Sequence, residues 1–356
     1  MSKIGVGIIG CGDIARTRFL PAIDSSPAFE LKGLHSRRAA GCEELAARYG
    51  GCCYGDLHAL LSAADVDAVV VATPHPSHAE LSIRCLGAGK HVLCEKPMAT
   101  SIADANRICE AASRSDRVFM ALPLNNSPAV EAAKTFIGAG AIGQVCAADA
   151  VLAHDGPSHA AWYFDRHTAG WGVLADLGIY LVAQLVYLLG TARAAVGRTE
   201  TVYARRVLQT GAVVDASVED NAAAVITWPN GVLATIRANW CSPGDRRNVI
   251  CGTTIYGSSG LIFINPASET DSLVLHLPVK PIEGASRIEF NGMTDCYRAA
   301  LPAWNQDRAI MDSFARSIAR SALARTGASN ALEQRHVIET IVKIYEFSAK
   351  QSGERI

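Results

Sequence analysis

Hydrophobic and polar residues follow two different patterns along the chain, and the change comes near residue 123. Before it, short apolar runs such as 4–9 and 67–72 alternate with segments of helical periodicity. Runs that are apolar at nearly every position are typical of parallel strands buried on both faces, and their alternation with helices indicates a doubly wound sheet. The pattern therefore predicts an α/β domain with a parallel sheet over residues 1–123.

Beyond residue 124 the pattern indicates strands that follow one another without intervening helices. Two hairpins are expected, one joining 225–228 to 232–237 and one joining 253–256 to 261–264. We expect residues 124–356 to form an α+β domain for substrate binding and oligomerisation, built on a large, mostly antiparallel, open-faced sheet. The uncovered face needs a partner, which predicts a homodimer or homotetramer. Helices are expected over 304–324 and 331–350, and the C-terminal helix is able to pack back on the first domain.

Composition narrows the class of partner. The chain has 356 residues, with 33 Lys and Arg against 34 Asp and Glu, so it carries no strong field for nucleic acid or an anionic membrane. A small-molecule partner is expected. No apolar stretch reads as long and uncharged enough to span a membrane. The 11 cysteines lack metal-site spacing, so we expect reduced thiols, no metal and a cytoplasmic protein.

A glycine-rich turn follows the first strand. Its sequence, Gly10-Cys11-Gly12-Asp13-Ile14-Ala15, leads directly into a helix. Gly10 permits a tight turn, Gly12 lets the backbone approach a pyrophosphate, and Ala15 lets the helix pack on the strand. The alternative is a tight turn without a ligand, but the place between strand and helix favours a Rossmann cofactor site that includes Asp13 and Ile14.

The second strand, 29–35, ends at Ser36-Arg37-Arg38. An NAD enzyme usually places an acidic residue here to hold the ribose hydroxyls. A hydroxyl and two guanidinium groups suit a ribose phosphate instead, because arginine binds phosphate through paired charge-assisted hydrogen bonds. Two exposed arginines at the start of a helix are the alternative, but that interpretation leaves the missing acid unexplained. The sequence favours NADP, with NAD possible.

A lysine follows the strand 91–94, in the segment Glu95-Lys96-Pro97. Ligands of open α/β sheets bind at the carboxyl ends of strands, so Lys96 is expected in the ligand crevice, on backbone stiffened by the proline. The alternative is a surface lysine beside a turn proline. The neighbouring strand ends at Thr73, and the cofactor residues expected from these two strand ends are Thr73, Pro74, His75, His78, Glu95 and Lys96.

A carboxylate and a phenol lie on a predicted helix over 173–189. Asp176 and Tyr180 are four residues apart and share a helix face, so with Lys96 they would make a catalytic proton-transfer set. Taken singly, a tyrosine such as Tyr180 is more often a core aromatic residue, and an aspartate such as Asp176 is more often a capping or salt-bridged acid. Substrate contacts are expected from Lys96, Asp176 and Tyr180, and from Asn126, Trp162, His167 and Trp171, which are equally compatible with packing roles. The loops 155–168 and 241–247 are expected to set specificity.

These motifs together resemble the glucose-fructose oxidoreductase and inositol dehydrogenase family (Gfo/Idh/MocA). The resemblance rests on the glycine turn, Ala72-Thr73-Pro74 with His78, the segment 89–97, Gly140-Ala141-Ile142-Gly143, and Asp176-Leu177-Gly178-Ile179-Tyr180. Many members have histidine where this chain has Tyr180. Tyrosine there resembles the branch of glucose-fructose oxidoreductase, dimeric dihydrodiol dehydrogenase and xylose dehydrogenase, and the Ser36-Arg37 pair resembles the NADP-binding pattern of the same branch.

The resemblance implies a Rossmann domain, an open-faced sheet used in oligomerisation and a cis peptide before Pro97. It also implies hydride transfer between NAD(P) and a secondary or anomeric alcohol of a sugar, polyol or related carbohydrate. Two alternatives stay open: a non-catalytic regulator that senses NADP or a sugar, and a hydrolase or lyase that uses tightly bound NAD transiently.

Overall fold

The computed structural model describes residues 3–242, 251–265, 272–277, 286–290, 293–299, 301–302, 304–324 and 329–352. The chain divides into two compact units, Met1–Leu124 with Asn305–Ile338, and Asn125–Trp304 with Glu339–Ile356. We expected all of 124–356 to lie in the second domain, whereas Asn305–Ile338 is part of the first unit.

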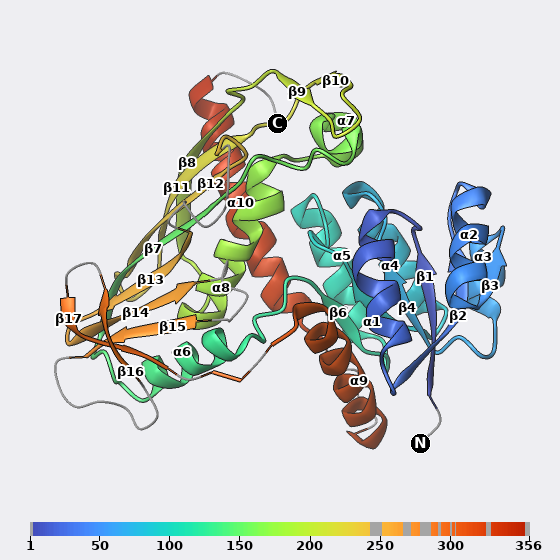
Figure 1. Ribbon diagram of the computed structural model, residues 1–356, viewed down its shortest axis with the longest axis horizontal. Helices are drawn as coiled ribbons and strands as arrows, with labels where there is room; N and C mark the ends of the chain where they lie inside the picture. The colour runs from blue at the N-terminus through green and yellow to red at the C-terminus, as the bar shows by residue number, and fades with distance from the viewer. Residues whose placement is uncertain are drawn as a thin grey trace. The chain divides into compact units, whose positions relative to one another are not determined.

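The first unit is built on a six-stranded parallel sheet with the order β3-β2-β1-β4-β5-β6 (Figure 1). The central strands β4 and β5 are buried at every residue, which explains their unbroken apolar sequence. The strand order reverses between β1 and β4, and such a switch point opens a ligand crevice at the carboxyl ends of the strands. The strands are β1 (Ile4–Ile9), β2 (Phe29–His35), β3 (Cys52–Tyr54), β4 (Ala68–Val71), β5 (His91–Cys94) and β6 (Phe119–Ala121).

Helices alternate with these strands, and a helix from the C-terminal part of the chain joins them. Helix α9 contributes Ile310, Met311 and Phe314 to the apolar core of this unit, and the ring of Phe314 stacks on Phe29 of β2 with centroids 6.1 Å apart. This packing is why α9 belongs to the first unit. The helical elements are η1 (Ala15–Phe19), α1 (Leu20–Asp24), α2 (Ala39–Tyr49), α3 (Leu57–Ser62), η2 (His75–Ser77), α4 (His78–Gly87), α5 (Ile102–Ser113) and α9 (Gln306–Ala324).

The second unit is built on a nine-stranded sheet with the order β16-β17-β15-β14-β13-β7-β12-β11-β8. Among these strands β7 and β12 run parallel, and the other neighbouring pairs run antiparallel. Both expected hairpins are confirmed, as β11–β12 and β13–β14. The strands are β7 (Val145–Ala153), β8 (Ala194–Glu200), β11 (Asn221–Thr227), β12 (Leu233–Asn239), β13 (Gly252–Gly257), β14 (Gly260–Asn265), β15 (Ser272–His276), β16 (Ser286–Phe290) and β17 (Met293–Arg298).

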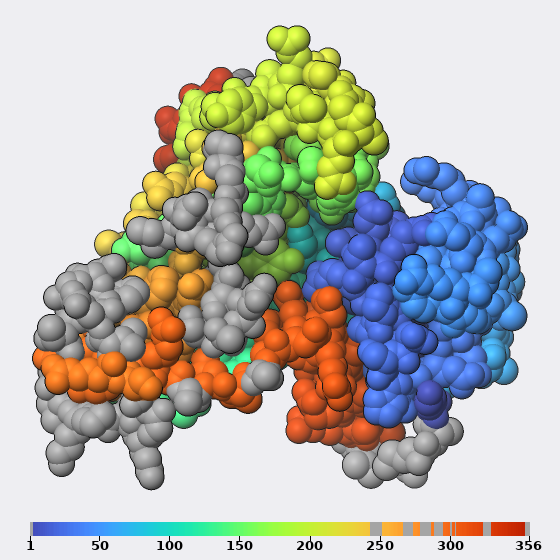
Figure 2. All heavy atoms as spheres, viewed as in Figure 1, coloured from blue at the N-terminus to red at the C-terminus, as the bar shows by residue number. Residues whose placement is uncertain are grey.

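Helices lie along one face of this sheet, where Figure 1 shows α6, α8 and α10. On β11 and β12 buried and exposed residues alternate, so one face of each strand meets the helices while the other stays uncovered. A small arm of two strands, β9 (Arg205–Val207) and β10 (Val213–Asp215), lies at the surface (Figure 2). The helical elements are α6 (Pro128–Gly138), η3 (Ala161–Phe164), α7 (Arg166–Ala169), η4 (Leu174–Gly178), α8 (Ile179–Leu189) and α10 (Ala331–Ser352), whose residues divide between the units.

Two expectations from composition need correction. The helical stretch Arg166–Leu189 is long and apolar enough to cross a membrane, contrary to our expectation, but 78% of its apolar window is buried inside the protein, as in the core helix of a globular fold. Cys42 and Cys53 form a disulfide, although we expected reduced thiols throughout. An odd number of scattered cysteines gives no pairing signal, whereas the fold brings α2 next to β3. The fold class itself, a Rossmann domain followed by an α+β domain with a large, mostly antiparallel sheet, is confirmed.

Candidate active site

Four loops of the first unit leave the same edge of its sheet. They follow β1 at Gly10, β2 at Ser36, β4 at Ala72 and β5 at Glu95. Because the four strands are parallel neighbours in the order β2-β1-β4-β5, their carboxyl ends meet at one edge. The cofactor residues predicted from sequence therefore come from loops that the fold gathers there.

The two glycines of the turn serve different purposes. Gly10 has φ +102°, and a Cβ on it would lie 2.4 Å from the carbonyl oxygen of Ala72, so the turn itself requires glycine. At Gly12, by contrast, a Cβ would meet no atom within 4 Å. Gly12 and Asp13 are exposed and Ile14 is half-buried. The open space above Gly12 fits a loop whose backbone is approached by a pyrophosphate.

The tip after β2 presents positive charge. Arg37 and Arg38 are exposed, and the half-buried Ser36 accepts a hydrogen bond from the backbone N–H of Arg38 over 3.5 Å. Sequence reasoning missed Arg16. Its guanidinium donates to the carbonyl of Cys11 at 3.3 Å and to the Glu44 carboxylate at 2.7 Å, so it ties the glycine turn to α2.

His78 connects two of the loops from inside the protein. Its Nδ1 lies 2.8 Å from the carbonyl oxygen of Pro97, and its Nε2 lies 2.6 Å from that of Thr73. The side chain is 0% exposed, and this burial lowers its pKa. His78 therefore supports both loops, and its predicted contact with the cofactor stays a prediction. His75, also predicted, is buried beside it, and Pro74 is half-buried.

Lys96 is held through its backbone. The buried carboxylate of Glu95 accepts the N–H of Lys96 at 2.9 Å, and its other oxygen lies 3.4 Å from Arg18, which also pairs with Asp307 at 2.7 Å. The peptide between Lys96 and Pro97 is cis, as the family resemblance implies. These contacts assign Glu95 to orienting the backbone of the half-buried Lys96.

Asp176 and Tyr180 belong to the second unit. Asp176 lies in η4, a π-helical turn, and Tyr180 lies in the first turn of α8. We expected a regular α-helix from residue 173, but the turn that carries Asp176 is wider, and such π turns are frequent at functional sites. Asp176 is 8% exposed and its carboxylate accepts the indole N–H of Trp240 at 3.3 Å. Tyr180 is half-buried.

The predicted substrate residues are distributed over the second unit. Trp162 stacks on Tyr163 with ring centroids 3.9 Å apart, and Trp171 stacks on Tyr345 at 5.3 Å. His167 is exposed at the start of α7, and Asn126 is half-buried. Of the specificity loop expected over 241–247, residues 243–247 lie outside the described part of the chain.

The structure thus gathers the predicted cofactor segments and Lys96 in the first unit, and Asp176 and Tyr180 in the second. Sequence reasoning missed Trp240 and Glu219. They contact the helix that carries Asp176 and Tyr180 across 64 and 47 residues of sequence. Neither follows a motif, and no local spacing pointed to them.

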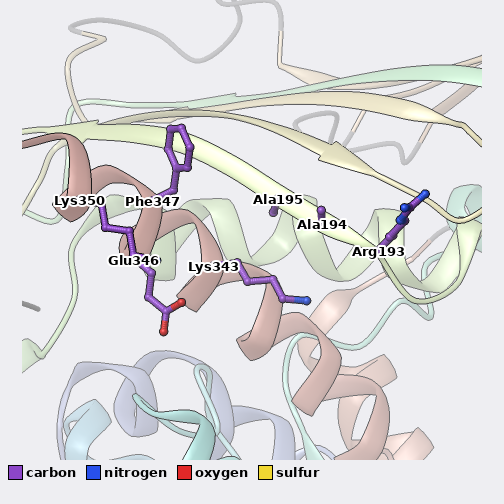
Figure 3. Close-up of a pocket in the computed structure, with 7 residues that line it drawn as sticks. All are labelled: Arg193, Ala194, Ala195, Lys343, Glu346, Phe347 and Lys350. Carbon is purple, nitrogen blue, oxygen red and sulfur yellow. The ribbon is translucent and has the colours of Figure 1, made fainter.

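A separate pocket of about 270 Å³ lies between β8 and α10 (Figure 3). It contains none of the predicted site residues. In the close-up Phe347 and Glu346 extend in opposite directions from α10. The lining residues are Arg193, Ala194, Ala195, Lys343, Glu346, Phe347 and Lys350.

Comparisons with known proteins cover both units. Residues 4–122 match the Gfo/Idh/MocA oxidoreductase family with an NAD-binding Rossmann fold, and residues 130–262 match the Gfo/Idh/MocA C-terminal domain. The chain is 31% identical over 322 residues to the dTDP-3,4-didehydro-2,6-dideoxy-alpha-D-glucose 3-reductase of Streptomyces violaceoruber, covering 89% of this chain and 85% of the relative. It is 29% identical over 293 residues to the levoglucosan dehydrogenase of Pseudarthrobacter phenanthrenivorans, covering 74% of each.

The mouse trans-1,2-dihydrobenzene-1,2-diol dehydrogenase is 28% identical over 308 residues, covering 83% of this chain and 88% of the relative. Among solved structures, a 3-ketoreductase from Actinomadura kijaniata in complex with NADP and TDP-benzene superposes with a TM-score of 0.75 at 25% identity, covering 97% of this chain and 98% of the other. With family matches on both units and a 31% identical relative aligned over most of its length, the resemblance is confirmed. The chain belongs to the Gfo/Idh/MocA family of oxidoreductases.

Proposed function

We propose that the protein is an NAD(P)-dependent dehydrogenase or reductase that acts on CH–OH groups. It moves a hydride between nicotinamide and a secondary or anomeric alcohol of a sugar, polyol or related carbohydrate. The observation that carries this proposal is the shared sheet edge of the first unit, from which the Gly10 turn, the Ser36 tip and the Lys96 segment all leave. A glycine turn open above Gly12 is what a dinucleotide needs.

NADP is the preferred cofactor and NAD is possible. The exposed guanidinium groups of Arg37 and Arg38, next to the Ser36 hydroxyl, suit a ribose phosphate. The 3-ketoreductase that superposes on this chain contains NADP, which supports the same preference here. Gly10, Gly12, Asp13 and Ile14 would hold the pyrophosphate, and Thr73 and Pro74 would line the crevice beside β4.

A bound nicotinamide supplies the acceptor or donor of the hydride. The Lys96 ammonium donates a hydrogen bond to the reacting oxygen of the substrate and stabilises the charge that develops there. The Tyr180 hydroxyl takes or gives the alcohol proton, which is general acid–base catalysis. Asp176, fixed by Trp240, orients the pair.

The substrate class follows from chemistry that the relatives' names share. They act on a dTDP-sugar, on levoglucosan and on a cyclic diol. Each name describes a ring that carries a secondary alcohol or its ketone. In this chain Trp162 and Trp171 provide flat aromatic surfaces for such a ring, and Asn126 and His167 provide polar contacts.

The open face of the nine-stranded sheet supports assembly with a second copy of the chain. Val196, Val225 and Leu233 come from the adjacent strands β8, β11 and β12 and are exposed on this face. A contiguous apolar surface of this kind is typical of an interface between subunits. A homodimer or homotetramer formed through it would show in sedimentation or light-scattering measurements.

The test is to mix the protein with NADP or NAD and a panel of aldoses, inositols and anhydrosugars, and to follow nicotinamide absorbance. Lys96→Met and Tyr180→Phe should reduce turnover roughly 10²- to 10⁴-fold and leave cofactor affinity intact. Wild-type turnover in both variants would refute the assignment. A protein that binds NADP without reducing or oxidising it with any substrate would be a sensor, and one that shows turnover without net reduction would use NAD transiently. The relatives named above are dehydrogenases and reductases, and they favour neither alternative.

A further inference from the structure

A single buried side chain holds the beginning of the helix that carries Asp176 and Tyr180. The carboxylate of Glu219, which precedes β11, accepts the backbone N–H of Gly172 at 3.1 Å and that of Leu174 at 3.2 Å. The backbone carbonyl of Glu219 accepts the N–H of Val173, between them, at 3.0 Å. Three consecutive N–H groups at the start of this helix are therefore bound by one residue from elsewhere in the chain.

Such N–H groups have no partner within their own helix, and a negative charge near them is favourable because of the helix dipole. Gly172 is in turn hydrogen-bonded to Asp176, because the N–H of Asp176 donates to the carbonyl of Gly172 at 3.0 Å. Any movement of Gly172 away from Glu219 would shift the turn that carries Asp176.

The fit around Gly172 is close. A Cβ on this residue would lie 2.1 Å from the carbonyl oxygen of Glu219 and 2.7 Å from its carboxylate. Glycine at position 172 is therefore what allows the carboxylate to reach the helix. This contact gives a structural reason for the glycine that follows Trp171, a residue that we predicted to contact the substrate.

Tyr345 of α10 completes the arrangement. Its hydroxyl donates to the Glu219 carboxylate at 2.5 Å, and its ring stacks on Trp171 with centroids 5.3 Å apart. One pair of side chains, Glu219 and Tyr345, thus contacts the start of the catalytic helix and the aromatic side chain that precedes it.

We propose that Glu219, supported by Tyr345, is a positioning residue for the reaction: it fixes the start of the helix and thereby the places of Asp176 and Tyr180. The inference rests on the proposed function, since it assumes that those two residues act on the substrate. Glu219 acts through the backbone of residues 172–174 and not by touching substrate or cofactor.

Titration of Glu219 offers a way to see this role. Burial raises the pKa of Glu219, while the hydrogen bond from Tyr345 and the backbone N–H groups work in the opposite direction. The ionised carboxylate of Glu219 accepts hydrogen bonds from the N–H groups of Gly172 and Leu174 and from the Tyr345 hydroxyl. A protonated carboxyl group would carry a hydrogen that faces these donors and would lose part of its capacity to accept. Tyr345 is the titratable group that faces Glu219 from α10. Of the nearby acids, Asp220 pairs with Arg206 and Asp176 is contacted by Trp240.

The experiment compares Glu219→Gln and Tyr345→Phe with two matched controls. The controls are Glu131→Gln and Tyr187→Phe, because the Tyr187 hydroxyl also donates to a carboxylate, that of Glu131, at 2.9 Å, but on the exposed surface of α6 and α8. For each variant kcat, KM and NADP affinity are measured across pH with a substrate found in the panel assay. Tyr180→Phe is run in parallel.

Glu219→Gln should lower kcat about 10- to 100-fold at unchanged NADP affinity, because the amide N–H₂ cannot accept from the helix. Tyr345→Phe removes a donor that favours the ionised carboxylate, so the acid limb of kcat should move about one pH unit upward while the plateau stays near the wild-type value. Both controls should behave like the wild type.

Wild-type kcat and an unchanged acid limb in both Glu219→Gln and Tyr345→Phe, with Tyr180→Phe inactive, would overturn the positioning role while leaving the proposed function in place. Wild-type turnover of Tyr180→Phe would instead refute the proposed function, and this inference with it. If Glu219→Gln fails to fold, as judged by lost NADP binding and circular dichroism, the acid limb of Tyr345→Phe decides alone.

Discussion

The indole N–H of Trp240 donates to the Asp176 carboxylate over 3.3 Å, although the two residues are 64 positions apart in the sequence. Trp240 is 1% exposed, and its ring packs edge-on against Phe164 with centroids 5.8 Å apart. Its backbone carbonyl accepts from Arg206 at 3.0 Å, and Arg206 pairs with the buried Asp220 at 2.5 Å. The direction of the Asp176 carboxylate is therefore set by a buried network, which strand β12 and the β9–β10 arm bring together.

This contact predicts that Trp240→Phe lowers kcat about 10-fold. The phenyl ring keeps the packing against Phe164 but removes a hydrogen bond to a carboxylate, and one such bond contributes about 1.5–3 kcal/mol. Trp228→Phe is the matched control, because Trp228 is also buried and its indole donates to the carbonyl of Gly190 at 2.8 Å, away from Asp176. Steady-state kinetics of the two variants would separate the effects. Equal kcat in Trp240→Phe and the wild type would show that the hydrogen bond has no part in catalysis.

Elements with local signals were predicted well from the sequence. Strands β1, β2 and β5 have the bounds that the sequence pattern and the turn residues indicate. The reason is physical for β1 and β5: both are buried at nearly every residue, so each is an almost wholly apolar run, and a polar or glycine-rich segment follows it. The glycine turn and the segment around Lys96 were found for the same reason, since each follows such a strand directly.

Features that depend on the register of distant segments were not predictable. The contacts of Glu219 and Trp240 with the helix that carries Asp176 and Tyr180 depend on how β11 and β12 lie against it. The parallel pairing of β12 with β7 has no local signal in the sequence. The Cys42–Cys53 disulfide depends on α2 lying beside β3. The packing of α9 in the first unit depends on the contact of Phe314 with Phe29, which lies 285 residues earlier in the sequence.

Substituting alanine at the two glycines of the turn should have different effects: Gly10→Ala should affect stability, and Gly12→Ala should affect NADP binding. Gly10→Ala should lower the free energy of unfolding by about 1–3 kcal/mol, because alanine is strained at φ +102° and its Cβ would lie 2.4 Å from the Ala72 carbonyl. Gly12→Ala should leave unfolding within about 0.5 kcal/mol of the wild type, since its Cβ meets no atom within 4 Å.

The second half of this prediction concerns NADP. Gly12→Ala should weaken NADP binding, because the added methyl group occupies the space through which the backbone meets a pyrophosphate. Thermal unfolding and fluorescence titration with NADPH measure the two quantities separately. Wild-type NADPH affinity in a folded Gly12→Ala protein would argue against this turn as the pyrophosphate site.

Cofactor preference should depend on Arg37. Arg37→Ala should raise KM for NADP about 10- to 100-fold and change KM for NAD little, because a charge-assisted hydrogen bond to the ribose phosphate is lost and NAD has no such phosphate. Arg114→Ala is the control, since Arg114 is an exposed arginine of the same unit, paired with Glu110 at the end of α5. An equal rise in KM for NADP and NAD would mean that Arg37 contacts a group that both cofactors have, and not the ribose phosphate.

The stability of the first unit should fall in mildly acidic solution because of His91. This residue, the first of β5, is 8% exposed, and its Nδ1 accepts the backbone N–H of Val118 at 3.0 Å. Burial, aided by Arg117, lowers the pKa of His91 from 6.5 to about 4. Since the folded pKa lies below the unfolded one, the unfolded chain binds more protons between these values. The contribution of His91 is therefore fully present above about pH 6.5 and is lost as the pH falls toward about 4, by at most about 3 kcal/mol.

His91→Asn tests this directly, because the asparagine side-chain oxygen replaces the Nδ1 acceptor and does not titrate. Between about pH 7 and pH 5 the variant should lose less unfolding free energy than the wild type, as measured by urea titration with circular dichroism, and its Val118 amide should keep its protection from hydrogen exchange. His58→Asn, a substitution of an exposed histidine on α3, should show the wild-type pH dependence. Equal losses in His91→Asn and the wild type would mean that protonation of His91 does not limit the acid stability of this unit.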